Sequence, residues 1–215
     1  MMGLQRDYAK THKLAEHQHG VVTAAQLVRS GVEPGSTSDM VADGDTLWEE
    51  RSGIYSVPSL FDMEYGYFHV LWESLAPDLY TAEKMSAEIA CSIGVFCHYT
   101  AADFHGASNL PTEVQLTCPG PVELQGAVIH VGEVQPDEIV WIDDLPVTSV
   151  ERTTYDIGHM PIDDDWSSRW MRHVVEGCGW SLGHVCEVMG PESEYALPNY
   201  TKATRGPMPS HGWQR

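Results

Sequence analysis

Apolar positions between Met1 and Pro58 recur at helical spacing and then at the spacing of strands. The spacing predicts helices over residues 7–19 and 24–29, followed by a third short helix that ends at Gly44. The β-rich run of residues 46–58 predicts two short strands around an Arg-Ser-Gly turn. This N-terminal part of the chain is therefore predicted to form three helices and a hairpin.

Hydroxyl side chains stand before the second and third of these helices. Thr23 directly precedes residues 24–29, and Ser36 or Thr37 precedes the third helix. Such side chains accept hydrogen bonds from the free backbone N–H groups of a first turn, so we expect them to be N-caps. Three helices and a hairpin are the plan of a winged helix-turn-helix domain, whose third helix and hairpin usually face DNA.

The pattern changes after Pro58, which predicts a boundary between domains. We expect an α+β protein with a winged helix-turn-helix domain over residues 1–60, a mixed α/β domain over 61–190 and a mobile tail over 191–215. In the second domain we expect helices at 61–75, 82–93, 100–105, 165–176 and 181–189, and strands at 95–98, 113–118, 127–131, 139–142 and 146–149.

Composition places the chain among folded proteins. It has 215 residues, of which 42% are hydrophobic and 20% charged, and this excludes the disordered and collagen-like classes. No apolar run approaches the ~20 residues of a membrane helix. Charged residues interrupt the stretch from Met1 to Gly20, where a secretory signal would be apolar. We expect a cytoplasmic protein without membrane contact.

Negative charge is concentrated in the middle of the chain. Twelve basic and 31 acidic residues give a net charge of −19, and residues 61–160 alone hold 16 acidic and two basic residues. Such a segment repels nucleic acid and attracts cationic surfaces. An acidic proteome, in which the charge serves solubility, explains the same excess.

No pattern of catalytic or metal-binding residues stands out. Phosphate-binding glycine loops and the G-x-S-x-G motif of serine hydrolases are absent, so we predict no enzyme, no catalytic residue and no cofactor. Cys91, Cys97, His98 and His105 lie close in sequence but lack the paired spacing of a zinc site. We therefore expect no metal, reduced cysteines, and histidines that pack and hydrogen-bond in the core.

Two further pairs of residues lie one helical turn apart. Trp166 and Trp170 share a face of a predicted helix, and that face serves either core packing or docking. Arg152 and Asp156 have the same spacing, which predicts an ion pair.

Five short motifs, in order, resemble the AbiEi family of antitoxins from type IV toxin–antitoxin systems. The family's "G-x-v-T-x-x-q-l" and "r-G-v-Y" segments correspond to residues 20–27 and 52–55. Its "s-H-x-S/T-A-A-x-x-H-G" segment corresponds to 98–106, and "P-x-x-v-x-l-T-x-P" to 111–119. Its "d-g-l-P-V-T-x-x-x-R-T-x-x-D" segment corresponds to 143–156, with Asp144 in place of glycine. The resemblance covers about 150 residues, and each motif alone is weak.

The resemblance implies a regulator with two partners. Family members repress their own operon through the winged helix and counteract a nucleotidyltransferase-like toxin encoded beside them. Some relatives carry a further nuclease-like domain, so a degenerate nuclease relative is a third alternative.

The expected DNA-binding surface departs from the family in its charge. Residues 33–50 contain six acidic and no basic residues, whereas Lys and Arg supply most non-specific affinity for DNA. The candidate DNA-binding residues are the two nearby arginines and three hydroxyl residues at a helix N-terminus: Arg29, Arg51, Ser36, Thr37 and Ser38.

A protein-interaction module is the competing hypothesis. In that case the winged helix no longer binds DNA, and the acidic middle segment docks on a basic partner. Nucleotidyltransferase-like toxins hold triphosphates and nucleic acid and so need cationic clefts. The candidate partner-binding residues are Glu133, Asp137 and Glu138.

Overall fold

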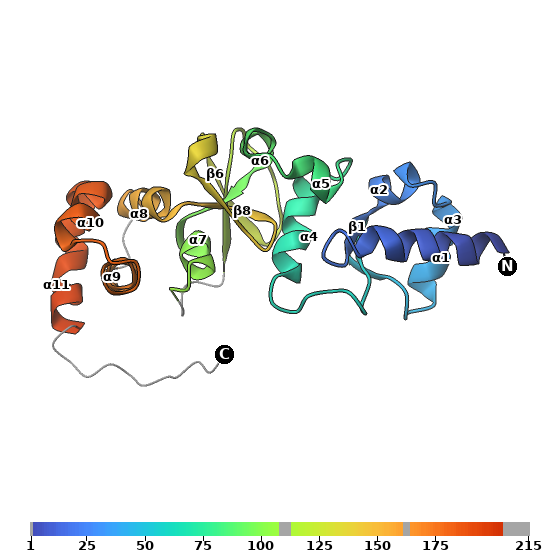
Figure 1. Ribbon diagram of the computed structural model, residues 1–215, viewed down its shortest axis with the longest axis horizontal. Coiled ribbons are helices and arrows are strands. Elements are labelled where there is room, and N and C mark those ends of the chain that lie inside the picture. Colours follow the sequence, from blue (N-terminus) through green and yellow to red (C-terminus); the bar gives the residue numbers. More distant parts are fainter. Residues whose placement is uncertain (1, 108–112, 161–163, 204–215) are drawn as a thin grey trace. The chain divides into compact units, whose positions relative to one another are not determined.

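The computed structural model describes residues 2–107, 113–160 and 164–203 (Figure 1). Within these residues the protein combines helices with two β-sheets, which confirms the predicted mixed α+β class. The chain divides into two compact units, each built from segments that are apart in the sequence. The two-sheet unit holds residues 2–96 and 113–147, and the helical unit holds residues 97–107, 148–160 and 164–203.

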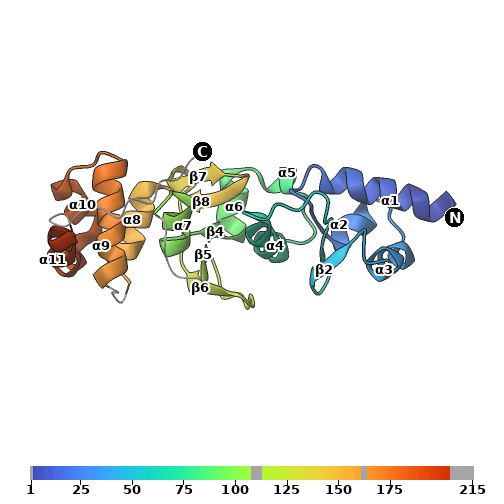
Figure 2. The ribbon, with the colours of Figure 1, turned by 90° about the horizontal axis from the view of Figure 1, so that it is seen from below.

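Three helices and a small antiparallel sheet form the first part of the two-sheet unit. Its elements are α1 (Met2–Ala15), β1 (Val21–Thr23), α2 (Ala24–Arg29), α3 (Pro34–Ala42), β2 (Trp48–Arg51) and β3 (Ile54–Ser56). The strand order is β1-β3-β2, so the predicted hairpin is extended by a strand that the sequence pattern did not indicate. Figure 2 shows β2 beside α3. The apolar core of these three helices and three strands consists of Ala15, Val22, Leu27, Val32, Met40, Leu47 and Val57.

Helix α2 begins and ends as predicted, and Thr23 caps its first turn with a capping box. The Thr23 hydroxyl accepts a hydrogen bond from the backbone N–H of Gln26 at 3.1 Å, and the Gln26 side chain accepts one from the Thr23 N–H at 2.9 Å. Helix α1 is shorter than expected at its C-terminal end. It ends at Ala15, whose carbonyl accepts from the N–H of Gly20, a residue with a φ of 77° that favours glycine.

Helix α3 begins earlier than predicted. Its N-cap is Glu33 and its first residue is Pro34, which fits there because the N–H that proline lacks has no partner in a first turn. Ser36 and Thr37 therefore lie inside the helix, and the predicted capping role for them is wrong.

A five-stranded mixed sheet and three helices form the second part of the unit. Its elements are α4 (Gly66–Leu75), α5 (Thr81–Lys84), α6 (Ala87–Ile93), β4 (Val95–Phe96), β5 (Val114–Cys118), β6 (Ala127–Val131), η1 (Pro136–Glu138), β7 (Ile139–Ile142) and β8 (Leu145–Thr148). The strand order is β6-β5-β4-β8-β7. Strand β4 is antiparallel to β5 and parallel to β8, and β5 is parallel to β6. Each β-rich run predicted in this region forms a strand.

The single helix predicted over residues 82–93 is two helices. The chain leaves helical geometry at Met85, and Ser86 caps α6 by accepting a hydrogen bond from the N–H of Ile89 at 3.2 Å. The break turns Lys84 into the interior, where its side chain is fully enclosed. The spacing of apolar residues does not predict this break, because a lysine such as Lys84 is expected on the solvent-facing side of a helix.

An apolar contact joins the two parts of this unit. Val21, Ile54 and Val70 form one buried cluster, and Phe61 packs against it. The Phe61 ring lies 2.5 Å from the position that a Cβ of Gly66 would take, so residue 66 has no room for a side chain. Helix α4 starts at this glycine and not at residue 61 as predicted.

A buried ion pair lies at the centre of a polar network between the same two parts. Lys84 Nζ donates to Glu73 Oε2 at 2.7 Å, and the two side chains are 0% and 1% exposed. Gln26 Nε2 donates to the same oxygen at 2.7 Å, and Thr81 Oγ1 donates to Oε1 at 2.9 Å. Gln18 extends the network by donating to Gln26 at 2.8 Å. Burial lowers the pKa of Lys84, and the Glu73 carboxylate opposes that shift.

The compact units do not coincide with the predicted domain limits at residues 60 and 190. Because the network and the apolar contact connect α2 and β1 with α4 and α5, the segment before residue 60 belongs to the same unit as the five-stranded sheet. The predicted tail also begins too early, since Ser193–Ala203 form a helix. Residues 204–215 lie outside the described part of the chain.

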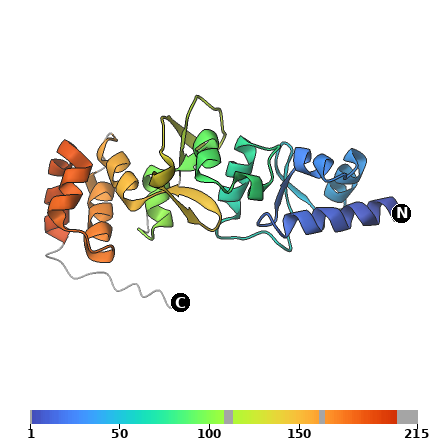
Figure 3. The same ribbon diagram turned by 45° about the horizontal axis from the view of Figure 1, so that its top comes forward.

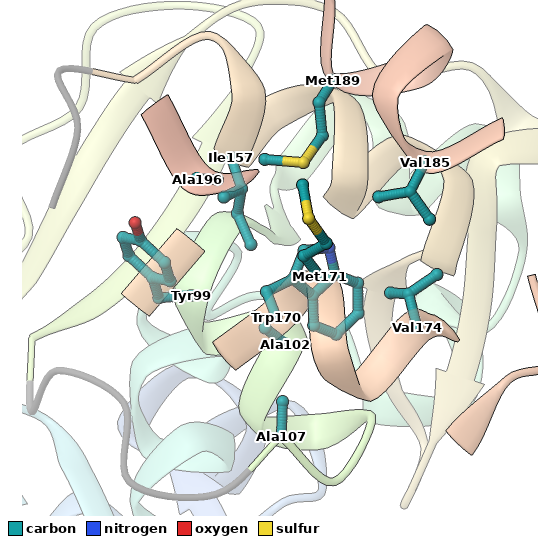
Figure 4. Packing of buried hydrophobic residues seen from close by; sticks show 10 residues of the cluster. All are labelled: Tyr99, Ala102, Ala107, Ile157, Trp170, Met171, Val174, Val185, Met189 and Ala196. Atoms are coloured by element: carbon teal, nitrogen blue, oxygen red, sulfur yellow. The ribbon is translucent and has the colours of Figure 1, made fainter. Parts of the chain in front are cut away.

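The helical unit packs helices around one apolar core. Its elements are α7 (His98–Phe104), α8 (Val150–Gly158), α9 (Asp164–Arg172), the π-helical segment η2 (His173–Gly177), α10 (Leu182–Met189), η3 (Gly190–Glu192) and α11 (Ser193–Ala203). Figure 3 shows the orange and red helices side by side, and Figure 4 shows Trp170 among Met171, Val174 and Ala102. The core also includes Tyr99, Ala107, Ile157, Val185, Met189 and Ala196.

Both predicted helical pairs have structural roles in this unit. Trp170 is fully buried and donates to Thr154 Oγ1 at 3.1 Å, and Trp166 packs against the same core, so the face serves core packing. Arg152 Nε donates to Asp156 Oδ1 at 2.7 Å, which confirms the predicted ion pair. Among the described helices, none has the length and apolar character needed to cross a membrane.

Removal of the buried negative charge provides a test of the polar network. Glu73→Gln leaves the Lys84 ammonium buried without a counter-ion, so we expect the free energy of unfolding to fall by about 3–5 kcal/mol. Urea titration followed by circular dichroism measures this change. Glu83→Gln, the same substitution in an exposed ion pair, is the matched control and should change stability little. Equal effects of the two substitutions would contradict the role given to Glu73.

Two half-buried histidines predict a loss of stability in acid. His105 and His173 lie against Trp170, and burial lowers the pKa of both below the ordinary 6.5. The unfolded chain then binds more protons than the folded chain, so the free energy of unfolding falls as the pH drops below about 6.5. Urea titrations between pH 7 and pH 5 should show a weaker pH dependence for His173→Gln. The exposed control His12→Gln should retain the wild-type dependence, and a His173→Gln curve equal to it would refute the assignment.

Candidate functional site

The predicted hydroxyl donors for DNA lie on α3, and one of them is used internally. Ser36 Oγ donates to Asp7 Oδ2 on α1 at 2.8 Å, and the backbone N–H of Glu33 donates to the same oxygen at 3.3 Å. These bonds hold the pKa of Asp7 below its usual value. Thr37 is half-buried, and Ser38 is exposed beside a shallow pocket shared with β2 and β3. The segment around these three hydroxyl residues, residues 33–50, contains acidic and no basic residues.

Arg29 is held by an acidic partner on α5. Its guanidinium donates to both carboxylate oxygens of Glu83, each at 2.6 Å, and to the carbonyl of Asp78 at 2.9 Å. It also lies 4.3 Å from the centre of the Tyr80 ring. The pair lowers the pKa of Glu83 to about 2. A phosphate would have to compete with this bidentate contact for Arg29.

Arg51 is turned toward a loop of its own unit. It lies at the end of β2, and its Nη2 donates to the carbonyl of Gln125, while its Nη1 is enclosed without a hydrogen-bond partner. The residue lines a groove of about 880 Å³ between the hairpin, α4 and residues 123–126. Glu50 and Glu123 line the same groove, so its charged groups are mostly acidic. Both candidate arginines are thus engaged within the two-sheet unit.

The predicted partner-binding acids lie in one short surface segment. Glu133 follows β6 and is exposed, and Asp137 and Glu138 belong to η1. Glu138 has a local structural role because its carboxylate accepts a hydrogen bond from the backbone N–H of Gln135 at 2.7 Å. Asp137 is exposed. Of the three acids, Asp137 and Glu138 lie in η1, which contacts α6.

The histidines of the central motif take part in hydrogen bonding, as expected. The motif of residues 98–106 forms α7, and His105 Nε2 donates to the carbonyl of Thr148 at 2.8 Å. His98 begins the helix with a φ of 51°, and its Nδ1 lies 2.9 Å from Cys97 Sγ.

A cluster of two histidines and two aspartates was not predicted. His19 precedes β1, His69 lies on α4, and Asp143 and Asp144 form the turn between β7 and β8. The two imidazole rings stack with centroids 4.0 Å apart and 9° between their planes. Asp143 Oδ2 lies 3.1 Å from His69 Nε2 and 3.6 Å from His19 Nδ1, while His19 Nε2 lies 3.0 Å from Asp144 Oδ2.

Burial differs within this cluster. The His69 side chain is 1% exposed, whereas His19 is 23% and Asp144 55% exposed. Burial, together with the neighbouring His19, lowers the pKa of His69 to about 4. The cluster is therefore anchored by a neutral buried imidazole and open to water on its other side. No spacing in the sequence marks it, since its members come from three segments that lie far apart along the chain.

Comparisons with known proteins do not identify the chain. A scan against models of protein families finds no match, and a search of curated proteins finds no match either.

Release of Arg29 provides a test of this surface. Glu83→Gln removes the carboxylate that holds the guanidinium, so we expect tighter binding to duplex DNA and a slope of log K against log salt that is steeper by about 0.9. Fluorescence anisotropy with DNA from the chain's own promoter, at several salt concentrations, measures both. Glu113→Gln makes the same change of charge at an exposed residue outside this pair and should leave the slope unchanged. Identical slopes for the two variants would rule out Arg29 as a latent phosphate ligand.

Proposed function

We propose that the protein is a non-enzymatic, cytoplasmic antitoxin of the AbiEi type that counteracts a nucleotidyltransferase-like toxin. The observation that carries the proposal is that residues of the ordered family motifs have structural roles. The Thr and Gln of the first motif are Thr23 and Gln26, which form the capping box of α2. The Arg and Asp of the last motif are Arg152 and Asp156, which form an ion pair on α8.

The N-terminal elements support a winged helix within this proposal. Their order is α1, β1, α2, α3, β2 and β3, and their sheet has the order β1-β3-β2. In a winged helix the third helix and the hairpin face DNA. Autoregulation of the operon would then use α3 and the turn between β2 and β3.

The charge of the two-sheet unit favours a second candidate function, a protein-interaction module without useful DNA affinity. Arg29 and Arg51 are bonded within the unit, and α3 contains one acidic residue, Asp39, and no basic residue. Each phosphate contact releases counterions, and without such contacts a winged helix loses most of its non-specific affinity. In the salt titration described above, a nanomolar complex of the wild type with its promoter at physiological salt favours the autoregulator. Absence of binding favours the interaction module.

The acidic segment around η1 is the candidate contact with the toxin. Glu133, Asp137 and Glu138 face a partner that needs a cationic cleft for triphosphate and nucleic acid. Complementary charge of this kind speeds encounter and selects partners, while buried apolar contacts supply most of the affinity.

Charge reversal in the full-length chain tests this function. We expect Glu133→Lys, Asp137→Lys and Glu138→Lys together to reduce growth rescue on induction of the cognate toxin, because the acidic contact is lost. The full chain is needed because the polar network joins Gln26 to Glu73, and truncation near residue 60 would cut it.

The matched control is a triple reversal on the N-terminal helices and hairpin, at Asp39, Asp45 and Glu49, which are also exposed. It should leave rescue largely intact. Circular dichroism must show that both triple variants are folded, since Glu138 also accepts a backbone hydrogen bond. Full rescue by the folded η1 variant would show that the acidity is solubility charge and would reject the proposed contact.

A further inference from the structure

The cluster of His19, His69 and Asp143 has the composition of a metal site. Imidazole and carboxylate together suit Zn²⁺ and similar first-row transition-metal ions, whereas Mg²⁺ and Ca²⁺ prefer oxygen ligands alone. One ligand atom from each of the three residues lies within 4.8 Å of the others. We propose that these residues bind one Zn²⁺-type cation and that Asp144 orients His19. This inference does not depend on the proposed function.

The two separations from Asp143 are close to those between ligands of a tetrahedral ion. Zinc binds nitrogen and oxygen at about 2.0–2.2 Å, so neighbouring ligand atoms around a tetrahedral zinc lie about 3.3–3.5 Å apart. The two separations from Asp143 Oδ2, 3.1 Å to His69 Nε2 and 3.6 Å to His19 Nδ1, lie on either side of that value. Three protein ligands leave a fourth position, which water can reach because Asp143 and His19 are partly exposed.

Asp144 supplies the support that a metal-bound histidine usually has. When Nδ1 of His19 faces the ion, Nε2 carries the proton and donates to Asp144 Oδ2 at 3.0 Å. A carboxylate in this position fixes the tautomer of the ring and raises its basicity. The four residues thus divide into three ligands and one positioning residue.

Left-handed backbone conformations are concentrated in the same cluster. Among the described residues, four that are not glycine have a positive φ, and three of these are His19 at 53°, Asp143 at 49° and Asp144 at 58°. Asp143 and Asp144 are the two residues between the neighbouring strands β7 and β8, where a tight hairpin turn needs a positive φ at both positions. The turn and the residue before Gly20 thus bring side chains from two separate segments to His69 on α4.

Ion binding requires one ring to move. An ion lies close to the plane of each imidazole that binds it, whereas the rings of His19 and His69 are parallel. His19 is the ring that turns, because it is partly exposed while His69 is enclosed. Bound metal would then tie the segment before β1, helix α4 and the β7–β8 turn together.

Calorimetric titration of the full-length protein with ZnCl₂, after removal of metal by a chelator, tests the proposal. We expect one equivalent to bind near neutral pH and MgCl₂ to give no binding. Asp143→Asn should abolish this binding because it removes the shared ligand, and asparagine tolerates the left-handed backbone that Asp143 adopts. Asp144→Asn should weaken the affinity for zinc by about 10–100-fold and retain the stoichiometry.

His12→Gln is the matched control. His12 lies 3.3 Å from Glu16 on the surface of α1 and belongs to no group of three ligating residues in the described chain. Its substitution should not change zinc binding. Heat released by ZnCl₂ that survives Asp143→Asn places the zinc elsewhere and overturns the proposal. So does a wild-type protein that takes up no zinc at micromolar concentrations. Asp144 is 55% exposed, so its variant tests the site even if substitution of Asp143 disturbs folding.

Discussion

The arrangement of the two-sheet unit depends on one buried carboxylate. Glu73 lies on α4 with its side chain enclosed, and an unpaired buried charge costs several kcal/mol. Its donors are Lys84, Thr81 and Gln26, which come from α5 and α2. Separation of α2 from α4 would remove one of these bonds, so the segment before residue 60 is held against the rest of the unit by electrostatics as well as by apolar packing.

Local interactions explain which features are predictable from the sequence. The capping box of Thr23 and the ion pair of Arg152 join residues three or four positions apart, and both follow from spacing alone. The buried position of Lys84 depends on a carboxylate 11 positions earlier in the chain, which no periodicity records. The same limit applies to the histidine cluster, because only the completed sheet brings the β7–β8 turn next to His69. Helix α11 was missed because proline and other weak helix formers in its sequence suggested an irregular tail.

Internal pairing changes the surface that a partner meets. A count of basic residues near α3 suggests two arginines for phosphate, but Arg29 and Arg51 bond to groups of their own unit. The acidic residues around η1 and on the N-terminal helices and hairpin are largely exposed. The Arg29–Glu83 pair cancels one charge of each sign, and Arg51 donates to a neutral carbonyl, so the net negative charge of this unit is unchanged while neither arginine is free for phosphate.

The division of the helical unit into separate segments has a consequence for synthesis on the ribosome. Helix α7 contacts α8, yet about 45 residues, most of them part of the two-sheet unit, are translated between the two helices. At ~5–20 residues per second this takes about 2–10 s. During that interval Tyr99 and Ala102, which are buried in the finished protein, have no core to enter. Nascent chains are thus exposed to chaperones and to aggregation at α7 before translation supplies its partner.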